Sequence, residues 1–465
     1  MARKRKILEN LKIVDVGAKA TGVAKHEGKV VFVENAIPGD VVDVLLTKNK
    51  TDWAKGRVQN LKEKSQYRID AFCNHFKYCG GCKWQNVDYK AQLNFKEKLV
   101  KDAIERIGKV SDAKHLPILG AEKTTFYRNK MEYSFSSERW KTQEEIASGK
   151  EIKANPALGL HVPKFFDKIV DIEKCYLQDA FADKIRNEVR EYAIENDLKF
   201  FDIRKQNGFL RTLIIRNTSI GEWMVILSFY EFDNKKMFAL LTHLSEKFPE
   251  INSLCYAVNP KGNDTLYDID IESFKGEPYI FEELGGLKFK ISPKSFFQTN
   301  SYQAQNLYDK TAEFAALTGK EVVYDLYSGT GTIGLYLAKN AKKIVGIETV
   351  EDAVVDANIN KELNNITNAN FYTGEVKDNI EKIIENEGKA DVVIVDPPRV
   401  GLHPKVVEQL LQLSAPKIVY VSCNPATQAR DLEMLSGKYK LVKYQPVDMF
   451  PHTYHIENVA ELVLK

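Results

Sequence analysis

The sequence predicts an α/β protein in which a doubly wound, mostly parallel sheet follows a strand-rich α+β region and a small β-barrel. Strand and helix patterns alternate in the last part of the chain, as they do in βαβ units. The middle carries antiparallel-type strands and two helical stretches, at 178–196 and 234–247. Short alternating strands separated by turn residues fill the amino-terminal part. We therefore expect three domains, at 1–64, 65–290 and 291–465.

The composition is typical of soluble globular proteins. Hydrophobic residues make up 44% of the 465 positions and charged residues 28%. No apolar run approaches the length of a membrane span, and the first ten residues contain no apolar signal segment. We expect a cytoplasmic protein that acts as a monomer and does not enter a membrane.

The amino-terminal region is more basic than the rest of the chain. Residues 1–64 contain 14 lysines and arginines against 8 acidic residues, although the whole chain has a net charge of only +3. Alternating runs such as 29–33 and 40–46 are typical of a small barrel. The region resembles the TRAM module of RNA-modifying enzymes, an oligonucleotide-binding-type (OB) barrel. The resemblance and the charge together imply that this domain binds RNA.

Cys73, Cys79 and Cys82 lie within ten positions of one another, with the spacing C-x5-C-x2-C. In a reducing compartment such a group indicates a metal or cluster site rather than disulfides. A tetrahedral zinc or a cubane cluster needs a fourth ligand, and Cys175, which follows an apolar run, is the best candidate. His75 could replace one sulfur. The residues alone leave zinc and iron–sulfur equally open.

Residues 89–109 have the pattern of an amphipathic helix. The apolar positions that share one face are Leu93, Leu99, Val100, Ala103, Ile104 and Ile107. An apolar face on a helix needs a neighbour to cover it. We expect this helix, in the segment of about 90–120, to pack on the carboxyl-terminal domain.

A glycine-rich turn follows the first strand of the carboxyl-terminal region. Residues 325–331 are Asp-Leu-Tyr-Ser-Gly-Thr-Gly, and Glu348 ends the next strand, where an acid can accept hydrogen bonds from ribose hydroxyls. The spacing differs from the G-x-G-x-x-G fingerprint of dinucleotide-binding proteins. The arrangement resembles that of S-adenosylmethionine-dependent methyltransferases, and a dinucleotide is the alternative ligand.

Two further strand ends carry reactive side chains. Asp396 begins Asp-Pro-Pro-Arg, and Cys423 lies in Ser-Cys-Asn-Pro after an apolar strand. The first motif resembles that of amine N-methylases, but Arg399 replaces their aromatic residue. Carbon-5 of a pyrimidine becomes nucleophilic only after a group such as a thiolate adds at carbon-6. A base must then remove the C5 proton, and Glu457 before the final strand is the candidate.

Together these motifs resemble the RNA uracil-C5 methyltransferases nearly from end to end, and the RumA-like 23S ribosomal RNA branch most closely. The resemblance implies Cys423 as nucleophile, Glu457 as proton acceptor and a [4Fe-4S] cluster on the four cysteines named above. It implies cofactor contacts from Gln298, Tyr327, Glu348 and Asp396. The target uridine has to leave its stack, so we expect base flipping from an RNA loop. The candidates to stack on displaced bases are Phe296, Phe297 and Tyr302.

Three alternatives remain. The tRNA branch of the family uses the same chemistry, although it typically lacks both the barrel and the cluster cysteines. Cytosine-C5 methylation uses the same thiol, but the sequence offers no clear glutamate partner for the cytosine amine. An iron–sulfur RNA-binding or redox-sensing protein without transferase activity would account for the cysteines and the basic barrel.

Overall fold

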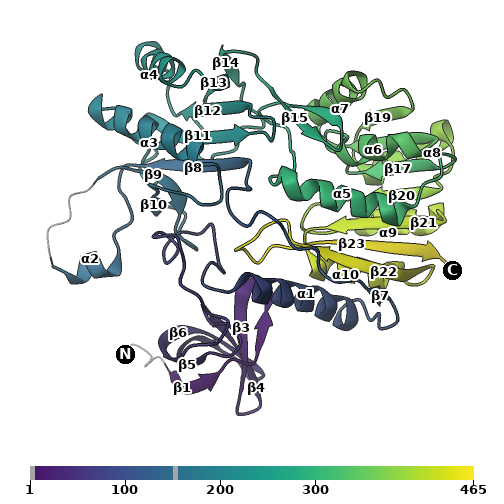
Figure 1. Cartoon of the computed structure of the whole chain (residues 1–465), viewed down its shortest axis with the longest axis horizontal. Helices are drawn as coiled ribbons and strands as arrows, with labels where there is room; N and C mark the ends of the chain where they lie inside the picture. Colours follow the sequence, from purple (N-terminus) through teal and green to yellow (C-terminus); the bar gives the residue numbers. More distant parts are fainter. Residues whose placement is uncertain (1–5, 150–154) are drawn as a thin grey trace.

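The strands of the described residues form four sheets, in three regions of the molecule (Figure 1). The computed structural model describes residues 6–149 and 155–465. The amino-terminal sheet lies at the bottom of Figure 1, the central sheet at upper left and the carboxyl-terminal sheet at right. The predicted α/β fold class, with an amino-terminal β-domain and a strand-rich centre, is confirmed.

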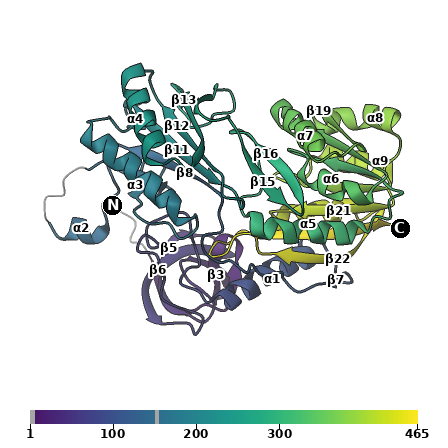
Figure 2. The same cartoon turned by 45° about the horizontal axis from the view of Figure 1, so that its top comes forward.

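The amino-terminal unit is a curved sheet of six strands around a core of its own (Figure 2). Its strands are β1 (Ile7–Lys12), β2 (Asp15–Gly17), β3 (Thr21–His26), β4 (Lys29–Glu34), β5 (Val41–Asn49) and β6 (Trp53–Glu63), in the order β1-β5-β6-β4-β3-β2. A single 3-10 turn, η1 (Ala18–Ala20), joins β2 to β3. Successive side chains of a strand point to opposite faces, so the alternating pattern buries Val31 and Val33 on β4, and Val42 and Val44 on β5.

The central unit is a seven-stranded sheet covered by helices. Its strands are β8 (Lys130–Ser136), β9 (Ala157–His161), β10 (Ile169–Asp171), β11 (Leu210–Asn217), β12 (Trp223–Phe229), β13 (Ile251–Val258) and β14 (Glu272–Lys275), in the order β10-β9-β8-β11-β12-β13-β14. Its helices are α2 (Gln143–Ala147), α3 (Ala180–Glu195) and α4 (Asn234–Lys247). Only β12 and β13 pair in parallel, because α4 carries the chain back between them.

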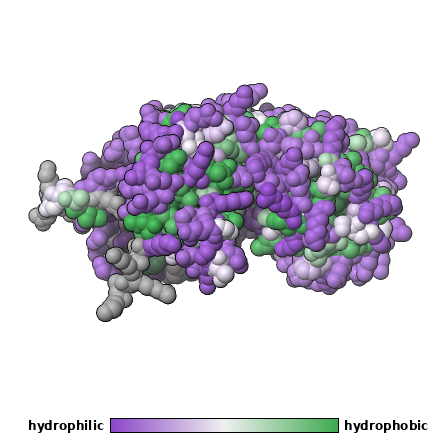
Figure 3. All heavy atoms as spheres, turned by 90° about the horizontal axis from the view of Figure 1, so that it is seen from below, coloured by the Kyte–Doolittle hydropathy of each residue, from purple (hydrophilic) through white to green (hydrophobic). Residues whose placement is uncertain are grey.

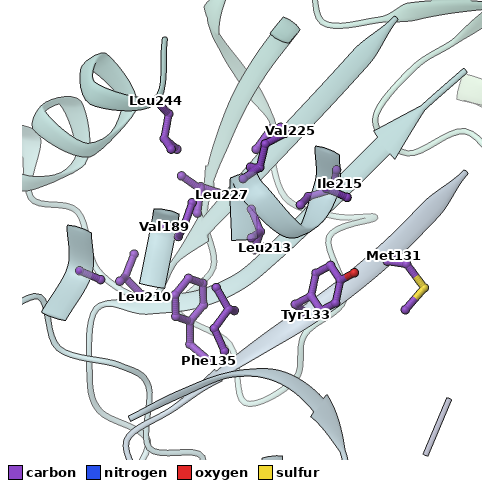
Figure 4. Close-up of a cluster of buried hydrophobic side chains, with 14 of the residues drawn as sticks. Met131, Tyr133, Phe135, Val189, Leu210, Leu213, Ile215, Val225, Leu227 and Leu244 are labelled. Atoms are coloured by element: carbon purple, nitrogen blue, oxygen red, sulfur yellow. The ribbon is translucent and has the colours of Figure 1, made fainter. Parts of the chain in front are cut away.

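The core of this unit lies between the sheet and α3 and α4 (Figure 4). Leu213 and Leu227 come from β11 and β12, and they meet Val189 of α3 and Leu244 of α4. All four are fully buried. Burying one such side chain contributes about 1.5–3 kcal/mol, so this apolar layer holds the helices on the sheet.

The carboxyl-terminal unit is an eight-stranded sheet. Its strands are β17 (Val322–Leu326), β18 (Lys343–Glu348), β19 (Ala369–Thr373), β20 (Val392–Val395), β21 (Lys417–Ser422), β22 (Tyr439–Val447) and β23 (Glu457–Leu464), joined by β7 (Lys114–His115). The order is β19-β18-β17-β20-β21-β23-β22-β7, and the first five strands are parallel. The order reverses between β17 and β20, which is where an open α/β sheet binds its ligand.

Helices cover both faces of this sheet. They are α5 (Ser301–Ala315), α6 (Thr332–Leu337) with the 3-10 turn η2 (Ala338–Asn340), α7 (Glu351–Leu363), α8 (Val376–Glu387), α9 (Pro404–Leu413) and α10 (Pro425–Leu435). A separate hairpin, β15 (Ile280–Leu284) and β16 (Leu287–Ile291), lies against α7. Asn360 and Asn364 of α7 accept hydrogen bonds from the amides of Lys290 and Lys288.

Helix α1 (Tyr89–Arg106) packs against α10 and β22 of the carboxyl-terminal unit, and β7 follows it into the sheet. Val100, Ala103 and Ile104 are buried there, whereas Ile107 is 41% exposed. Polar residues Gln92 and Lys96 are fully buried on this helix. The buried face of α1 therefore differs from the predicted one. In the amino-terminal half of the helix it includes the polar residues Gln92 and Lys96.

Seen from below, most of the surface is hydrophilic (Figure 3). The largest hydrophobic area on this face lies over the half of the molecule that holds the barrel and the central sheet. No helix within the described ranges is long and apolar enough to cross a lipid bilayer.

Candidate active site

Cys423 and Glu457 lie opposite each other at one end of the carboxyl-terminal sheet. β21 ends at Ser422 and β23 begins at Glu457, and the two strands are antiparallel, with Ser422 paired to Asn458. Continuing this register by one residue sets Cys423 beside Glu457. Asp396 directly follows β20, the parallel neighbour of β21. Three strand ends thus bring a thiol and two carboxyl groups to one edge of the sheet.

The thiol of Cys423 is half-buried and lies within range of the charges of both carboxyl groups. Burial raises its pKa to about 11, and the charges of Glu457 and Asp396 act in the same direction. The guanidinium of Arg399 acts against them. The resting thiol is therefore protonated at neutral pH, and the positive charge of Arg399 favours its ionisation.

Both carboxyl groups have raised pKa values. Glu457 is 4% exposed, and burial, together with the charge of Asp396, holds its pKa well above the ordinary range. Burial raises the pKa of Asp396 to about 7. A carboxylate with a raised pKa is a stronger base than an exposed one, which suits removal of a proton from carbon. The imidazole of His455 stays neutral, because burial and the charge of Arg399 lower its pKa to about 4.

The glycine turn after β17 has a left-handed backbone. Tyr327, Gly329 and Gly331 have φ angles of 67°, 54° and 76°. A Cβ atom on Gly331 would lie 2.8 Å from the ring of Phe371, so only glycine fits at that position. The amide of Gly329 donates a hydrogen bond of 2.9 Å to Oε2 of Glu348. The acid at the end of β18 therefore helps to shape the turn.

Gln298 lies in the stretch that leads into α5 and is 7% exposed. Its main-chain carbonyl accepts a hydrogen bond of 2.9 Å from Nδ2 of Asn129, next to β8. Asn300, the N-cap of α5, donates to the carbonyl of Met449 at 2.8 Å. The stretch is therefore tied both to the central unit and to the loop that precedes Glu457.

The three aromatic candidates differ in exposure. Phe296 is 64% exposed and Tyr302 is 47% exposed, with the ammonium of Lys123 lying 3.6 Å from the centre of the Tyr302 ring. Phe297 is 4% exposed, and its ring centre lies 5.9 Å from that of Phe289 in the core. A buried ring has no free face for a base, so Phe297 is a core residue.

A cavity of about 20 Å³ is lined by the four cysteines of the predicted cluster site, Cys73, Cys79, Cys82 and Cys175. His75 also lines it, and most other side chains around it are apolar. Burial raises the pKa of Cys79 to about 12. No three His, Cys, Asp or Glu side chains in residues 6–149 and 155–465 lie close enough together to hold a single metal ion. The four thiols share one cavity without forming a mononuclear site.

Comparisons with known proteins identify the family. Residues 9–58 match the TRAM domain, and residues 283–464 match the family described as tRNA (uracil-5-)-methyltransferase. A protein of Bacteroides thetaiotaomicron named as an uncharacterized RNA methyltransferase is 49% identical, over 97% of this chain and 100% of its own. A protein of the same name from Porphyromonas gingivalis is 47% identical, over 97% and 99%. The chain belongs to the RNA uracil-5 methyltransferase family.

A solved structure agrees with this assignment. The Pyrococcus abyssi tRNA (uracil-54, C5)-methyltransferase, in complex with S-adenosyl-L-homocysteine, is 30% identical to this methyltransferase. It superposes with a TM-score of 0.73 and covers 97% of this chain and 99% of that one. The predicted family, its TRAM domain and its Rossmann-like methyltransferase fold are confirmed. The protein is an RNA methyltransferase, and the alternative of a binding protein without transferase activity is not supported.

The turn of this methyltransferase has groups available for S-adenosylmethionine. Oδ1 of Asp325 and Oγ of Ser328 are buried at the turn without a hydrogen-bond partner. Glu348 uses one lone pair of Oε2 for the amide of Gly329, which leaves others for ribose hydroxyls. Tyr327 follows β17 directly and is half-buried. These residues fit a nucleoside ligand that carries several donors and a positive sulfonium.

Two contacts of the methyltransferase site were missed by the sequence interpretation. Asn129 holds Gln298 from the central unit, and no motif surrounds it. Lys96 of α1 pairs with Asp448, close to Glu457 in the chain. A signal for Lys96 existed, because it lies four residues before Val100 on the buried side of the helix.

Proposed function

We propose that this enzyme transfers a methyl group from S-adenosylmethionine to carbon-5 of a uridine in RNA, with Cys423 as nucleophile and Glu457 as base. The observation that carries the proposal is the position of Cys423 opposite Glu457 across β21 and β23. The charge of Asp396, which follows the neighbouring strand β20, acts on both groups. A nucleophile and a base so placed can act on adjacent atoms of one ring.

The reaction begins when the sulfur of Cys423 bonds to C6 of the uracil and its proton leaves to solvent. The electrons of the C5–C6 double bond move onto C5 and the neighbouring carbonyl, which makes C5 nucleophilic. S-adenosylmethionine, when bound, would supply an electrophilic methyl group to C5, with the sulfur–methyl bond breaking and S-adenosylhomocysteine as the leaving group. The carboxylate of Glu457 then removes the C5 proton. The double bond re-forms, the C6–sulfur bond breaks, and Cys423 leaves as a thiolate.

The reaction needs the thiolate of Cys423 and the carboxylate of Glu457, and the charge of Arg399 favours both. Its positive charge lowers the pKa of Cys423 and of Glu457, against the burial that raises them. Arg399 itself is exposed. We propose that it stabilises the thiolate as it leaves and the carboxylate before it accepts the proton.

The cofactor contacts are proposed for Gln298, Tyr327, Glu348 and Asp396. Tyr327 follows β17 and Glu348 ends the adjacent strand β18, whereas Asp396 follows β20, the strand on the other side of the reversal in strand order. Ligands bind at this reversal in open α/β sheets, which supports the assignment. Gln298 is held nearby by Asn129 and by the start of α5.

We propose a [4Fe-4S] cluster on Cys73, Cys79, Cys82 and Cys175. The common cavity of the four thiols and its mostly apolar lining support the proposal. A bound cluster supplies iron–thiolate bonds that join the segment of Cys73–Cys82 to that of Cys175. Zinc with His75 as a ligand is the alternative.

We propose 23S ribosomal RNA as the substrate. The four cysteines that line one cavity support the ribosomal branch. The barrel does not separate the two branches, because the Pyrococcus abyssi tRNA enzyme matches 97% of this chain. Transfer RNA is the second candidate, because the structurally similar Pyrococcus abyssi enzyme acts on uracil-54 of tRNA. Mapping 5-methyluridine in ribosomal and transfer RNA from cells that lack this chain decides between the two substrates.

We also propose that the domains divide at 1–64, 65–290 and 291–465. Each of these parts contains most of the strands of one large sheet, which supports the division, although the boundary at 290/291 falls within β16. Helix α1 and β7 lie in the second part but pack on the third.

The nucleophile is tested with RNA that contains 5-fluorouridine, whose C5 fluorine cannot be removed as a proton. The wild-type enzyme should form a covalent complex that survives denaturation, and Cys423→Ser should form none. Cys255→Ala, at a buried cysteine on β13, is the matched control and should form the complex. A complex that persists with Cys423→Ser means that another group is the nucleophile.

A further inference from the structure

The loop of residues 448–456 joins β22 to Glu457 and contains no helix or strand. It carries His455 and leads directly into β23, whose first residue is Glu457, the proposed base. His452 within it has a φ of 65°, an uncommon conformation for a residue other than glycine. A segment of this kind keeps one conformation only when its surroundings hold it.

The first contact that holds the loop is an ion pair with α1. Nζ of Lys96 lies 2.6 Å from Oδ1 of Asp448, and both side chains are 0% exposed. The same ammonium donates to the carbonyl of Phe450 at 3.0 Å. The hydroxyl of Tyr89, also on α1, donates to Oδ2 of Asp448 at 3.0 Å. One helix thus binds both oxygens of Asp448 and a main-chain group two residues further on.

A second set of contacts holds His452. Its amide donates to Oε1 of Gln92 on α1 at 2.9 Å. Its carbonyl accepts hydrogen bonds from the amides of Lys83 and Trp84, at 2.8 and 3.0 Å. These two residues directly follow Cys82. The loop therefore lies between α1 and the cysteine-bearing segment, with main-chain contacts to each.

A buried ion pair is not an efficient way to stabilise a fold, since two apolar residues of similar size often do as well. It does impose one geometry, because each charge must meet its partner. The side chain of a catalytic base has to be held within about 0.5 Å of its working position. We propose that Lys96 is a positioning residue: by binding Asp448 it holds the loop so that Glu457 faces the substrate carbon.

This inference rests on the proposed role of Glu457, and it separates two steps of the reaction. Formation of the covalent bond and methyl transfer need Cys423 and the glycine turn, which are on other strands. Proton removal and release of the RNA need Glu457. A displaced loop should therefore slow release while leaving the earlier steps intact, so that methylated RNA stays bonded to the enzyme.

The test uses the double variant Lys96→Met/Asp448→Leu, because removing Lys96 alone leaves a buried carboxylate without a counter-charge. With ordinary uridine RNA and S-adenosylmethionine, release should slow by about tenfold or more and the covalent complex should accumulate. Trapping with 5-fluorouridine RNA should stay within about twofold of wild type. Tyr89→Phe, which removes one hydrogen bond to Asp448, should show the same effect at smaller size.

Lys101→Met is the matched control, since Lys101 lies on the same helix, is 52% exposed and lies 3.8 Å from the carboxylate of Glu105. It should behave as wild type. The inference is overturned if the double variant slows trapping and release by the same factor. It is also overturned if neither rate changes. Glu457→Gln is tested in parallel: if it does not accumulate the complex, the assignment of Glu457 as base fails, and the inference fails with it.

Discussion

The buried carboxylate of Asp325 accepts a hydrogen bond of 2.8 Å from the main-chain amide of Gly334. The contact joins the end of β17 to the first turn of α6, directly beneath the glycine turn. Asp325 is 1% exposed, and burial raises its pKa to about 7 against the effect of this hydrogen bond. Asp325, beneath the proposed cofactor site, is therefore harder to ionise in the folded protein than an exposed aspartate.

Asp325→Asn should change how stability depends on pH. A carboxyl group with a raised folded-state pKa binds its proton more tightly in the native state, so stability falls as pH rises from about 4 through 7. Asparagine keeps an acceptor for Gly334 and has no proton to lose. The Tm of the variant relative to wild type should rise between pH 5 and pH 8. A difference in Tm that is constant with pH contradicts this.

Arg399→Gln should move the pH–rate profile to higher pH. Arg399 lowers the pKa of both Cys423 and Glu457, and each of them acts in its deprotonated form. Without the guanidinium both pKa values rise further, so activity near pH 7 falls and recovers at alkaline pH. The measurement is kcat against pH. Arg106→Gln, at a residue 72% exposed on α1, is the control, and an unshifted profile for Arg399→Gln rules out the proposed role.

Gly331→Ala should destabilise the protein and weaken cofactor binding. Its φ of 76° is strained for alanine, and the new Cβ would lie 2.8 Å from Phe371. The expected loss is about 1–3 kcal/mol, seen as a lower Tm and as weaker binding of S-adenosylhomocysteine by calorimetry. Gly329→Ala is the matched control, because a Cβ there meets no atom within 4 Å. Equal losses in the two variants would show that the contact with Phe371 does not matter.

Protein purified without oxygen should contain about four iron atoms per chain and absorb visible light. Cys175→Ala should remove most of the iron, because one of the four thiols that line the cavity is lost. Cys255→Ala, whose thiol is buried beside Ser253 on β13, should keep it. About one zinc atom per chain, with no visible absorbance, would favour the alternative metal.

Much of the active site was predictable because it lies where local patterns end. The apolar strand before Cys423 and the one before Asp396 each stop at a turn, and the ends of parallel strands meet at one edge of a sheet. Residues 325–331 were recognisable from their two glycines, both of which have the positive φ that only glycine adopts easily. The predicted buried face of α1 was partly wrong, because Lys96 and Gln92 are buried and Ile107 is not.

The sequence by itself therefore determined the family and the fold class, and it pointed to the glycine turn and to Cys423 as the proposed nucleophile. Only the tertiary structure decided that Glu457 lies opposite Cys423, that Asn129 holds Gln298, and that Lys96 pairs with Asp448. The partners in the last two contacts are 169 and 352 residues apart in the chain. A residue's own neighbours set its secondary structure, but register between strands and the pairing of buried charges depend on surfaces that meet only when the whole chain has folded.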